Sequence, residues 1–81
     1  MDINYVYLAD ERADDSNIDP ILAFPAVEGI NLSSSRITDK SLQRLSRFRQ
    51  LKVLQLFHVE TVTPSGIAEF QRRVPNCHVW R

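Results

Sequence analysis

The sequence predicts an α/β fold with parallel strands on one face and helices on the other, built as a short right-handed solenoid of strand–turn–helix units. Three observations lead to this. Apolar positions recur every 24 residues, at Ile3, Val27 and Leu51. Within a unit the apolar period changes from two, as in a half-buried strand, to three, as along one stripe of a helix. Thr and Pro residues mark helix starts and stops.

The first unit spans residues 3–26 and opens with an apolar segment at residues 5–8. Its helix has the weakest signal, because Pro20 would interrupt a helix that began much earlier. We expect the helix to start near Asp19, with Pro20 at its first position, and to end before Pro25.

The second unit spans residues 27–50, with a strand at 29–32. Thr38 is suited to cap the helix that follows, and Asp39 is favourable in its first turn. The apolar stripe of this helix consists of Leu42, Leu45 and Phe48. Apolar residues at these spacings are expected to face the strands.

The third unit spans residues 51–76, and its helix begins with Thr63 and Pro64 and stops at Pro75. It departs from the 24-residue period, because it needs one inserted residue around 59–61 and a second near Val74. The unit is followed by a terminal strand at 77–81.

The register of that terminal strand stays open. Either Cys77 and Val79 face inward, or Trp80 does.

Composition is that of one ordinary globular domain covering residues 1–81, with 43% hydrophobic and 25% charged residues. No apolar run approaches the roughly 18–20 residues of a membrane span, and the start lacks the features of a secretory signal. The single cysteine, Cys77, cannot form an internal disulfide. We therefore expect no membrane association and a cytoplasmic location.

Two segments resemble the leucine-rich repeat family, in its cysteine-containing and bacterial, planctomycete-like subclass. Residues 37–45, ITDKSLQRL, are similar to the helix entry of such repeats, and residues 66–77 resemble a closing repeat. Ser35 departs from the pattern, since it stands where Asn or Cys usually bonds the turn backbone. The resemblance implies a non-enzymatic protein-binding role, with the ligand on the concave sheet face.

Candidate partner-binding residues are those that alternate with the buried strand positions, together with the turn residues after them. They are Tyr5, Tyr7, Asn31, Ser33, Gln55, Phe57 and His58. Exposed aromatic residues are enriched at binding hot spots. The alternative, left open, is that these rings pack on each other or shield a thin core.

Charge is divided unevenly along the chain. Residues 1–28 carry seven acids and one base, a net charge of −6, and residues 29–81 carry nine bases and three acids, a net charge of +6. A second function therefore stays open: a structural subunit or cap that joins a larger complex, or a homo-oligomer formed through the open sheet edge. The acidic run 10–15 could meet the basic C-terminal end of a neighbour, but it is better interpreted as a solvated loop.

Other functions are not supported by the residues. The basic half lacks a nucleic-acid motif, so we expect a protein partner and not nucleic acid. The soft or imidazole ligands His58, Cys77 and His78 lack the spacing of a metal site. With two glycines and no catalytic motif, we expect no cofactor, no catalytic residue and no enzyme activity.

Overall fold

The computed structural model describes residues 4–81, so the expected start of the first unit at Ile3 lies outside the described residues. Short strands alternate with helical segments along the chain. In order these are β1 (Tyr5–Tyr7), the 3-10 helices η1 (Asp15–Asn17) and η2 (Asp19–Ala23), β2 (Gly29–Asn31), α1 (Asp39–Leu45), β3 (Val53–Gln55), α2 (Pro64–Arg73) and β4 (His78–Trp80).

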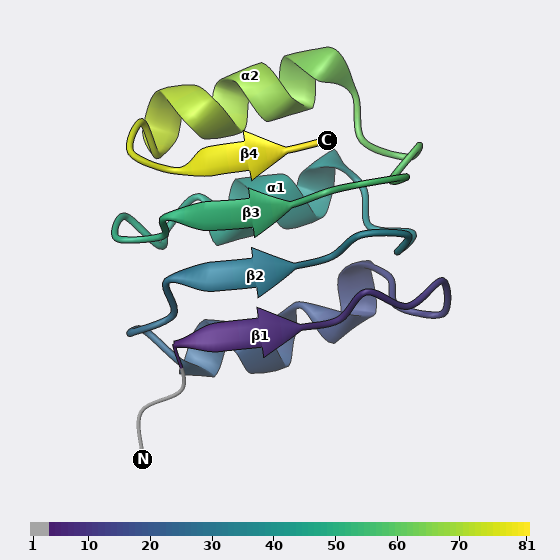
Figure 1. The fold of residues 1–81 in the computed structure, drawn as a ribbon, viewed down its shortest axis with the longest axis horizontal. Helices are drawn as coiled ribbons and strands as arrows, with labels where there is room; N and C mark the ends of the chain where they lie inside the picture. The colour runs from purple at the N-terminus through teal and green to yellow at the C-terminus, as the bar shows by residue number, and fades with distance from the viewer. Residues whose placement is uncertain (1–3) are drawn as a thin grey trace.

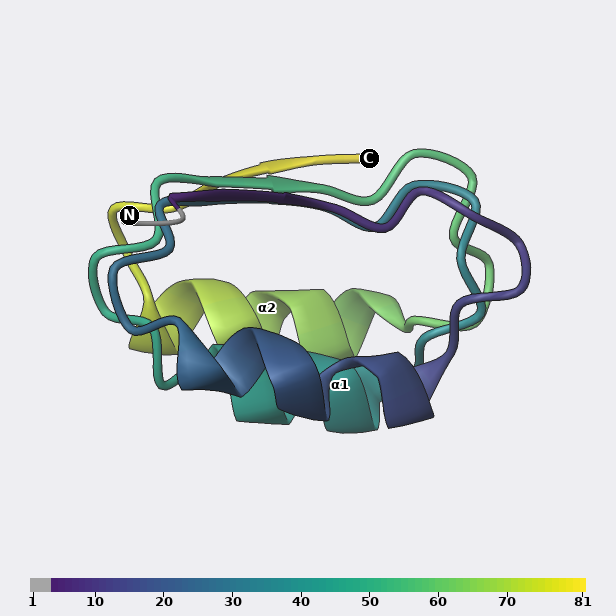
Figure 2. The same ribbon diagram turned by 90° about the horizontal axis from the view of Figure 1, so that it is seen from below.

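The four strands form one parallel sheet in the order β1-β2-β3-β4, and the helices lie in a second layer on one side of it (Figures 1 and 2). The register aligns one inward-facing residue from each strand, in a row of Val6, Ile30, Leu54 and Val79. Val79 is therefore the inward residue of the last strand, with Cys77 also buried and Trp80 outward. This settles the register that the sequence left open.

The core lies between the sheet and the helix layer. Leu42 and Leu45 of α1 are buried, as are Ile67 and Phe70 of α2. Phe48, the third member of the predicted stripe, is also buried but lies beyond the end of α1 at Leu45, so the period of three identified the buried residues but not the end of the helix. The predicted helix of the first unit begins at Asp19 as expected but is the 3-10 helix η2, and a second 3-10 helix that was not predicted, η1, precedes it.

Aspartate carboxylates join one helical segment to the next. Asp15 accepts hydrogen bonds from the Thr38 backbone N–H (2.8 Å), the Thr38 hydroxyl (2.6 Å) and the Ser41 hydroxyl. One unit later, Asp39 accepts from the backbone N–H (2.9 Å) and hydroxyl (2.6 Å) of Thr63. Each carboxylate thus holds the cap residue of the following helix, which fixes the spacing of the helix layer.

Gly66 is required by this arrangement. It lies in the first turn of α2, and a Cβ atom built there would collide with the Asp39 carboxyl group. A side chain at position 66 would displace the carboxylate that Thr63 engages. The glycine is therefore explained by close approach between α1 and α2, not by backbone conformation.

The prediction of a short right-handed leucine-rich-repeat solenoid is wrong. The structure is a compact two-layer α/β globule with principal extents of 33 × 27 × 18 Å. A solenoid is elongated along its stacking direction, whereas four strands about 4.8 Å apart add too little length for one axis to dominate. In Figure 2 the first three strands nearly superimpose and β4 tilts slightly away from them, so no concave trough is seen and the predicted concave face is an almost flat outer face.

We predict that Asp15→Ala lowers the free energy of unfolding by about 2–3 kcal/mol, because it leaves the half-buried Thr38 N–H and the buried Ser41 hydroxyl without their acceptor. Asp39→Ala, with only Thr63 as donor, should cost about 1 kcal/mol. Urea unfolding measures both, with Glu11→Ala, at an exposed position, as the control. Equal losses in all three variants would contradict this role.

Low pH should weaken the hydrogen bonds that the Asp15 carboxylate accepts. Partial burial raises the pKa of Asp15, but hydrogen bonds from Ser41 and Thr38 lower it more, so the net pKa lies below the ordinary 3.8. A depressed folded-state pKa gives stability that is complete above the unfolded value and is lost as pH falls through the folded one. Below pH 3.8 the stability difference between the wild type and Asp15→Asn should therefore shrink, as followed by urea unfolding against pH. A difference independent of pH would contradict the assignment.

Candidate functional site: the outer face of the sheet

The outer face of the sheet consists of two aligned rows of residues. Since neighbouring residues of a strand point to opposite faces, the residues flanking the inward row point away from the helices. The rows are Tyr5, Gly29, Val53 and His78, and Tyr7, Asn31, Gln55 and Trp80. None of the eight is Asp, Glu, Lys or Arg, although one residue in four of the whole chain is charged. Helices cover only the opposite side (Figure 2).

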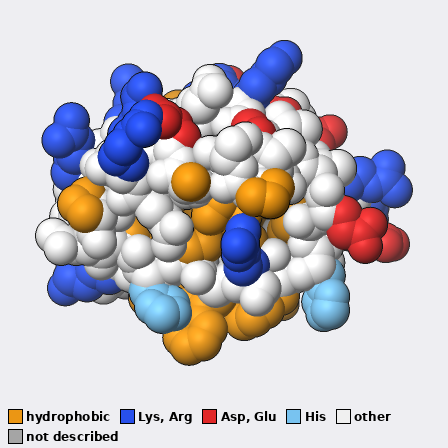
Figure 3. All heavy atoms as spheres, turned by 90° about the horizontal axis from the view of Figure 1, so that it is seen from above, with side chains coloured by type: hydrophobic (Ala, Val, Ile, Leu, Met, Phe, Trp, Pro, Cys, Tyr) orange, Lys and Arg blue, Asp and Glu red, His pale blue; other side chains and the backbone are white. Residues whose placement is uncertain are grey.

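Aromatic rings stand exposed on this face. The exposed fractions are 50% for Tyr5, 68% for Tyr7, 47% for Trp80 and 38% for Phe57, which follows β3. The ring of Trp80 lies 6.3 Å from that of Phe57 and 4.3 Å from that of His78, between centroids. Viewed from the α2/β4 end, hydrophobic side chains lie between the two histidines on the sheet side, whereas Lys and Arg gather mainly over the helices (Figure 3).

The side chain of Tyr5 extends from β1 across β2 to β3. A Cβ atom at Gly29 would meet its ring at 2.7 Å, so the ring lies directly on that residue. The Tyr5 hydroxyl donates to Gln55 Oε1 at 2.7 Å, two strands away. Beside the ring is a shallow groove of about 290 Å³, bordered by the Glu28–Lys52 ion pair. The side chain of Tyr5 is therefore held in place before any partner arrives.

Of the other predicted residues, Asn31 lies in an outward row, whereas Ser33, Phe57 and His58 lie in the turns that follow the strands. The Asn31 side-chain oxygen accepts from the Ser33 N–H (3.0 Å), and the Ser33 hydroxyl accepts from the Phe57 N–H (3.0 Å). Both side chains thus shape the turns. His58 is exposed in the turn after β3, with a left-handed φ of 61°. Tyr5, Tyr7, Asn31 and Gln55 share the two rows.

Trp80 is the functional candidate that the sequence analysis missed. The sequence predicted two inserted residues in the third unit, relative to the 24-residue period. With two insertions, the face on which Trp80 lies was left open. The structure pairs Leu54 with Val79, an offset of 25, so a single extra residue separates these strands. Counting one insertion would have placed Trp80 on the outer face.

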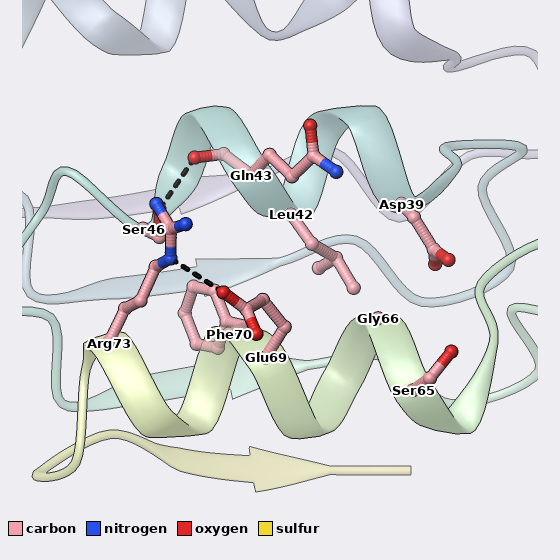
Figure 4. A pocket seen from close by; sticks show the side chains of 9 residues that line it. All are labelled: Asp39, Leu42, Gln43, Ser46, Ser65, Gly66, Glu69, Phe70 and Arg73. Atoms are coloured by element: carbon pink, nitrogen blue, oxygen red, sulfur yellow. Dashed lines mark hydrogen bonds and ion pairs between the residues drawn. The ribbon is translucent and has the colours of Figure 1, made fainter.

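The helix side has a smaller hollow between α1 and α2 (Figure 4). Its floor is apolar, with Leu42 and Phe70, and its volume is about 210 Å³. Its charged groups already have partners in the protein: Arg73 Nε donates to Glu69 Oε1 (2.9 Å), and Asp39 accepts from Thr63. Hydrogen bonds from Arg72 and Arg73 hold the pKa of Glu69 below its usual value. This hollow is explained by helix packing.

Within residues 4–81 no three His, Cys, Asp or Glu side chains lie together as a metal site would need. Burial raises the pKa of Cys77 to about 11, so its thiol stays protonated at neutral pH. In the same part of the chain, no helix is long and apolar enough to cross a membrane.

No protein-family model matches the chain, and no curated protein is similar to it in sequence. The resemblance to leucine-rich repeats therefore stays a prediction from the sequence. Among solved structures, a chain in the structure of Chaetomium Mex67:Mtr2 subunits is similar, with a TM-score of 0.72 and 20% identity. The match covers 96% of this chain and 53% of that one. At this identity the likeness shows an α/β fold alone, and the protein spans about half of its neighbour.

We predict that Gly29→Ala displaces the Tyr5 ring and breaks its hydrogen bond to Gln55, while the fold is retained. The added methyl group collides with the ring, but alanine removes a strand glycine, so the free energy of unfolding should change by less than about 1 kcal/mol. NMR should show shifted Tyr5 ring and Gln55 side-chain amide signals. Unchanged signals would contradict the described packing of Tyr5.

Proposed function

We propose that the protein is a non-enzymatic protein–protein interaction module that binds its partner through the outer face of the sheet. The observation that carries this is the pair of outward rows, which hold no Asp, Glu, Lys or Arg on any of the four strands and present aromatic rings from β1 and β4. Interface centres are depleted in charged residues and enriched in Tyr, Trp and Phe.

The energetics of this face favour association. Burying it would remove aromatic surface from water without desolvating an Asp, Glu, Lys or Arg side chain of the two rows. Tyr and Trp supply large contact areas at low entropic cost. Tyr5 is already held by Gly29 and Gln55, so less freedom is lost on binding. All-parallel sheets are usually covered on both faces, and a bound partner would supply the second cover here.

The nature of the partner and the cellular location are part of the same proposal. The similar chain comes from a structure of Mex67:Mtr2 subunits, and a chain that pairs with another protein fits the partner class proposed here. We propose a cytoplasmic location, supported by the single cysteine, which is buried and cannot form a disulfide within the chain.

We predict that Tyr7→Ser and Trp80→Ser each weaken partner binding about tenfold or more, because hot-spot aromatics typically contribute 1–2 kcal/mol or more. The partner is first captured from an extract with the immobilised wild-type chain and identified. Its dissociation constant is then measured for each variant by titration calorimetry. Both residues are exposed, so the folds should be unaffected.

Phe24→Ser is the matched control, since Phe24 is also an exposed aromatic residue but lies after η2 and outside the two rows. Arg47→Ala tests the helix side in the same way. The proposal is wrong if both face variants bind as the wild type does and a helix-side variant does not.

A further inference from the structure

The aromatic and imidazole rings of the outer rows are confined to the two edge strands. β1 contributes Tyr5 and Tyr7, and β4 contributes His78 and Trp80. The inner strands carry Gly29, Asn31, Val53 and Gln55 in the same rows. If β4 of one molecule lay beside β1 of another, rings would meet across the contact, and such cross-strand pairs are stabilising.

Backbone groups point outward from both edges. On β1, Asn4 O accepts from Gly29 N–H (3.0 Å) and Leu8 N–H donates to Asn31 O (2.8 Å). Bonding residues alternate along a strand, so Tyr5 and Tyr7 direct their N–H and C=O groups away from β2.

The same alternation applies to β4. His78 N–H donates to Lys52 O (2.8 Å), and Trp80 O accepts from Leu56 N–H (2.6 Å). Val79 therefore presents its backbone groups on the far side, so each edge can extend a parallel ladder.

The inward row of side chains is less well buried at its two ends than in its middle. Ile30 and Leu54 are fully buried, whereas Val6 and Val79 are only half-buried. Next to Val6, an apolar groove of about 390 Å³ opens between β1 and η2. It is lined by Tyr5, Val6, Leu8, Asn17, Pro20, Ile21 and Phe24.

The charges at the two ends of the sheet are of opposite sign. Residues 4–28, which include β1, η1 and η2, hold six acids and one base, for a net charge of −5. Residues 64–81, which include α2 and β4, hold three bases and one acid, for a net charge of +2. Joining these two ends is attractive, whereas joining two copies of the acidic end is repulsive.

We propose that a second copy of the chain docks on the β1 edge by adding its β4 in parallel. The register that continues the sheet sets Val79 of one copy beside Val6 of the other, with His78 beside Tyr5 and Trp80 beside Tyr7. This contact uses the edges, so it stands independently of the face-binding proposal. It is also heterologous, because two different surfaces meet, and assembly continues at the free ends.

The test is solution mass by light scattering, in dilute and concentrated solution and at low and high salt. The wild type should exceed its monomer mass of 9.4 kDa increasingly with concentration, and less so in high salt. Tyr7→Pro removes an outward N–H that no bond within the sheet needs, so it should weaken association about tenfold relative to Tyr7→Ser. A wild type that is monomeric at all concentrations, or equal association in the two variants, would overturn the proposal.

A cross-linking measurement identifies which strand edges meet between two copies, and it does not depend on the proline variant. Tyr7→Cys and Trp80→Cys proteins are mixed under mild oxidation. A disulfide-linked dimer should form in the mixture of the two variants and not when either variant is oxidised by itself. Native Cys77 is buried with a pKa of about 11, so it should stay unreactive in each single-variant control. Disulfide-linked homodimers of Tyr7→Cys alone would indicate antiparallel β1 pairing and overturn the head-to-tail arrangement.

Discussion

The in-register parallel pairing of four short strands is the constraint on which the rest of the structure depends. Tyr5, Gly29 and Val53 align at intervals of 24 residues, and His78 follows after 25. This pairing fixes one inward row, whose middle members Ile30 and Leu54 are fully buried. Since side chains alternate along a strand, it also fixes which residues face outward. The composition of the outer face is thus a consequence of register, and a one-residue slip of β1 would turn Tyr5 inward and Val6 outward.

The helix layer keeps the same interval by a different interaction. Asp15 and Asp39 lie 24 residues apart, and each accepts hydrogen bonds from the Thr that caps the helix of the following unit, α1 or α2. These bonds space the helices to match the strands, while the apolar residues between the layers supply the core. The hydroxyl of Ser35, where the family pattern has Asn or Cys, is buried without a partner among residues 4–81.

Much of the local structure could be predicted from the sequence, but the overall shape and part of the site could not. The period change identified the buried faces of α1 and β2, and the caps Thr38 and Thr63 were located correctly. The solenoid was wrong because periodicity reports local pairing, whereas overall shape depends on the number and length of the strands. Trp80 was missed because one insertion too many leaves the register undetermined. The Asp39–Gly66 contact joins two helices and has no local sequence signal.

The uncharged outer face of the sheet is, in our proposal, the surface that a protein partner covers. The most direct test is an NMR titration of the isotope-labelled chain with its captured partner, following every backbone amide and the Trp80 indole. Signals of residues 5–7, 29–31, 53–55 and 78–80 should shift or broaden, whereas the solvent-facing residues of α1 and α2 should not. Changes concentrated on α1 and α2, with the strand signals and the Trp80 indole unmoved, would contradict it.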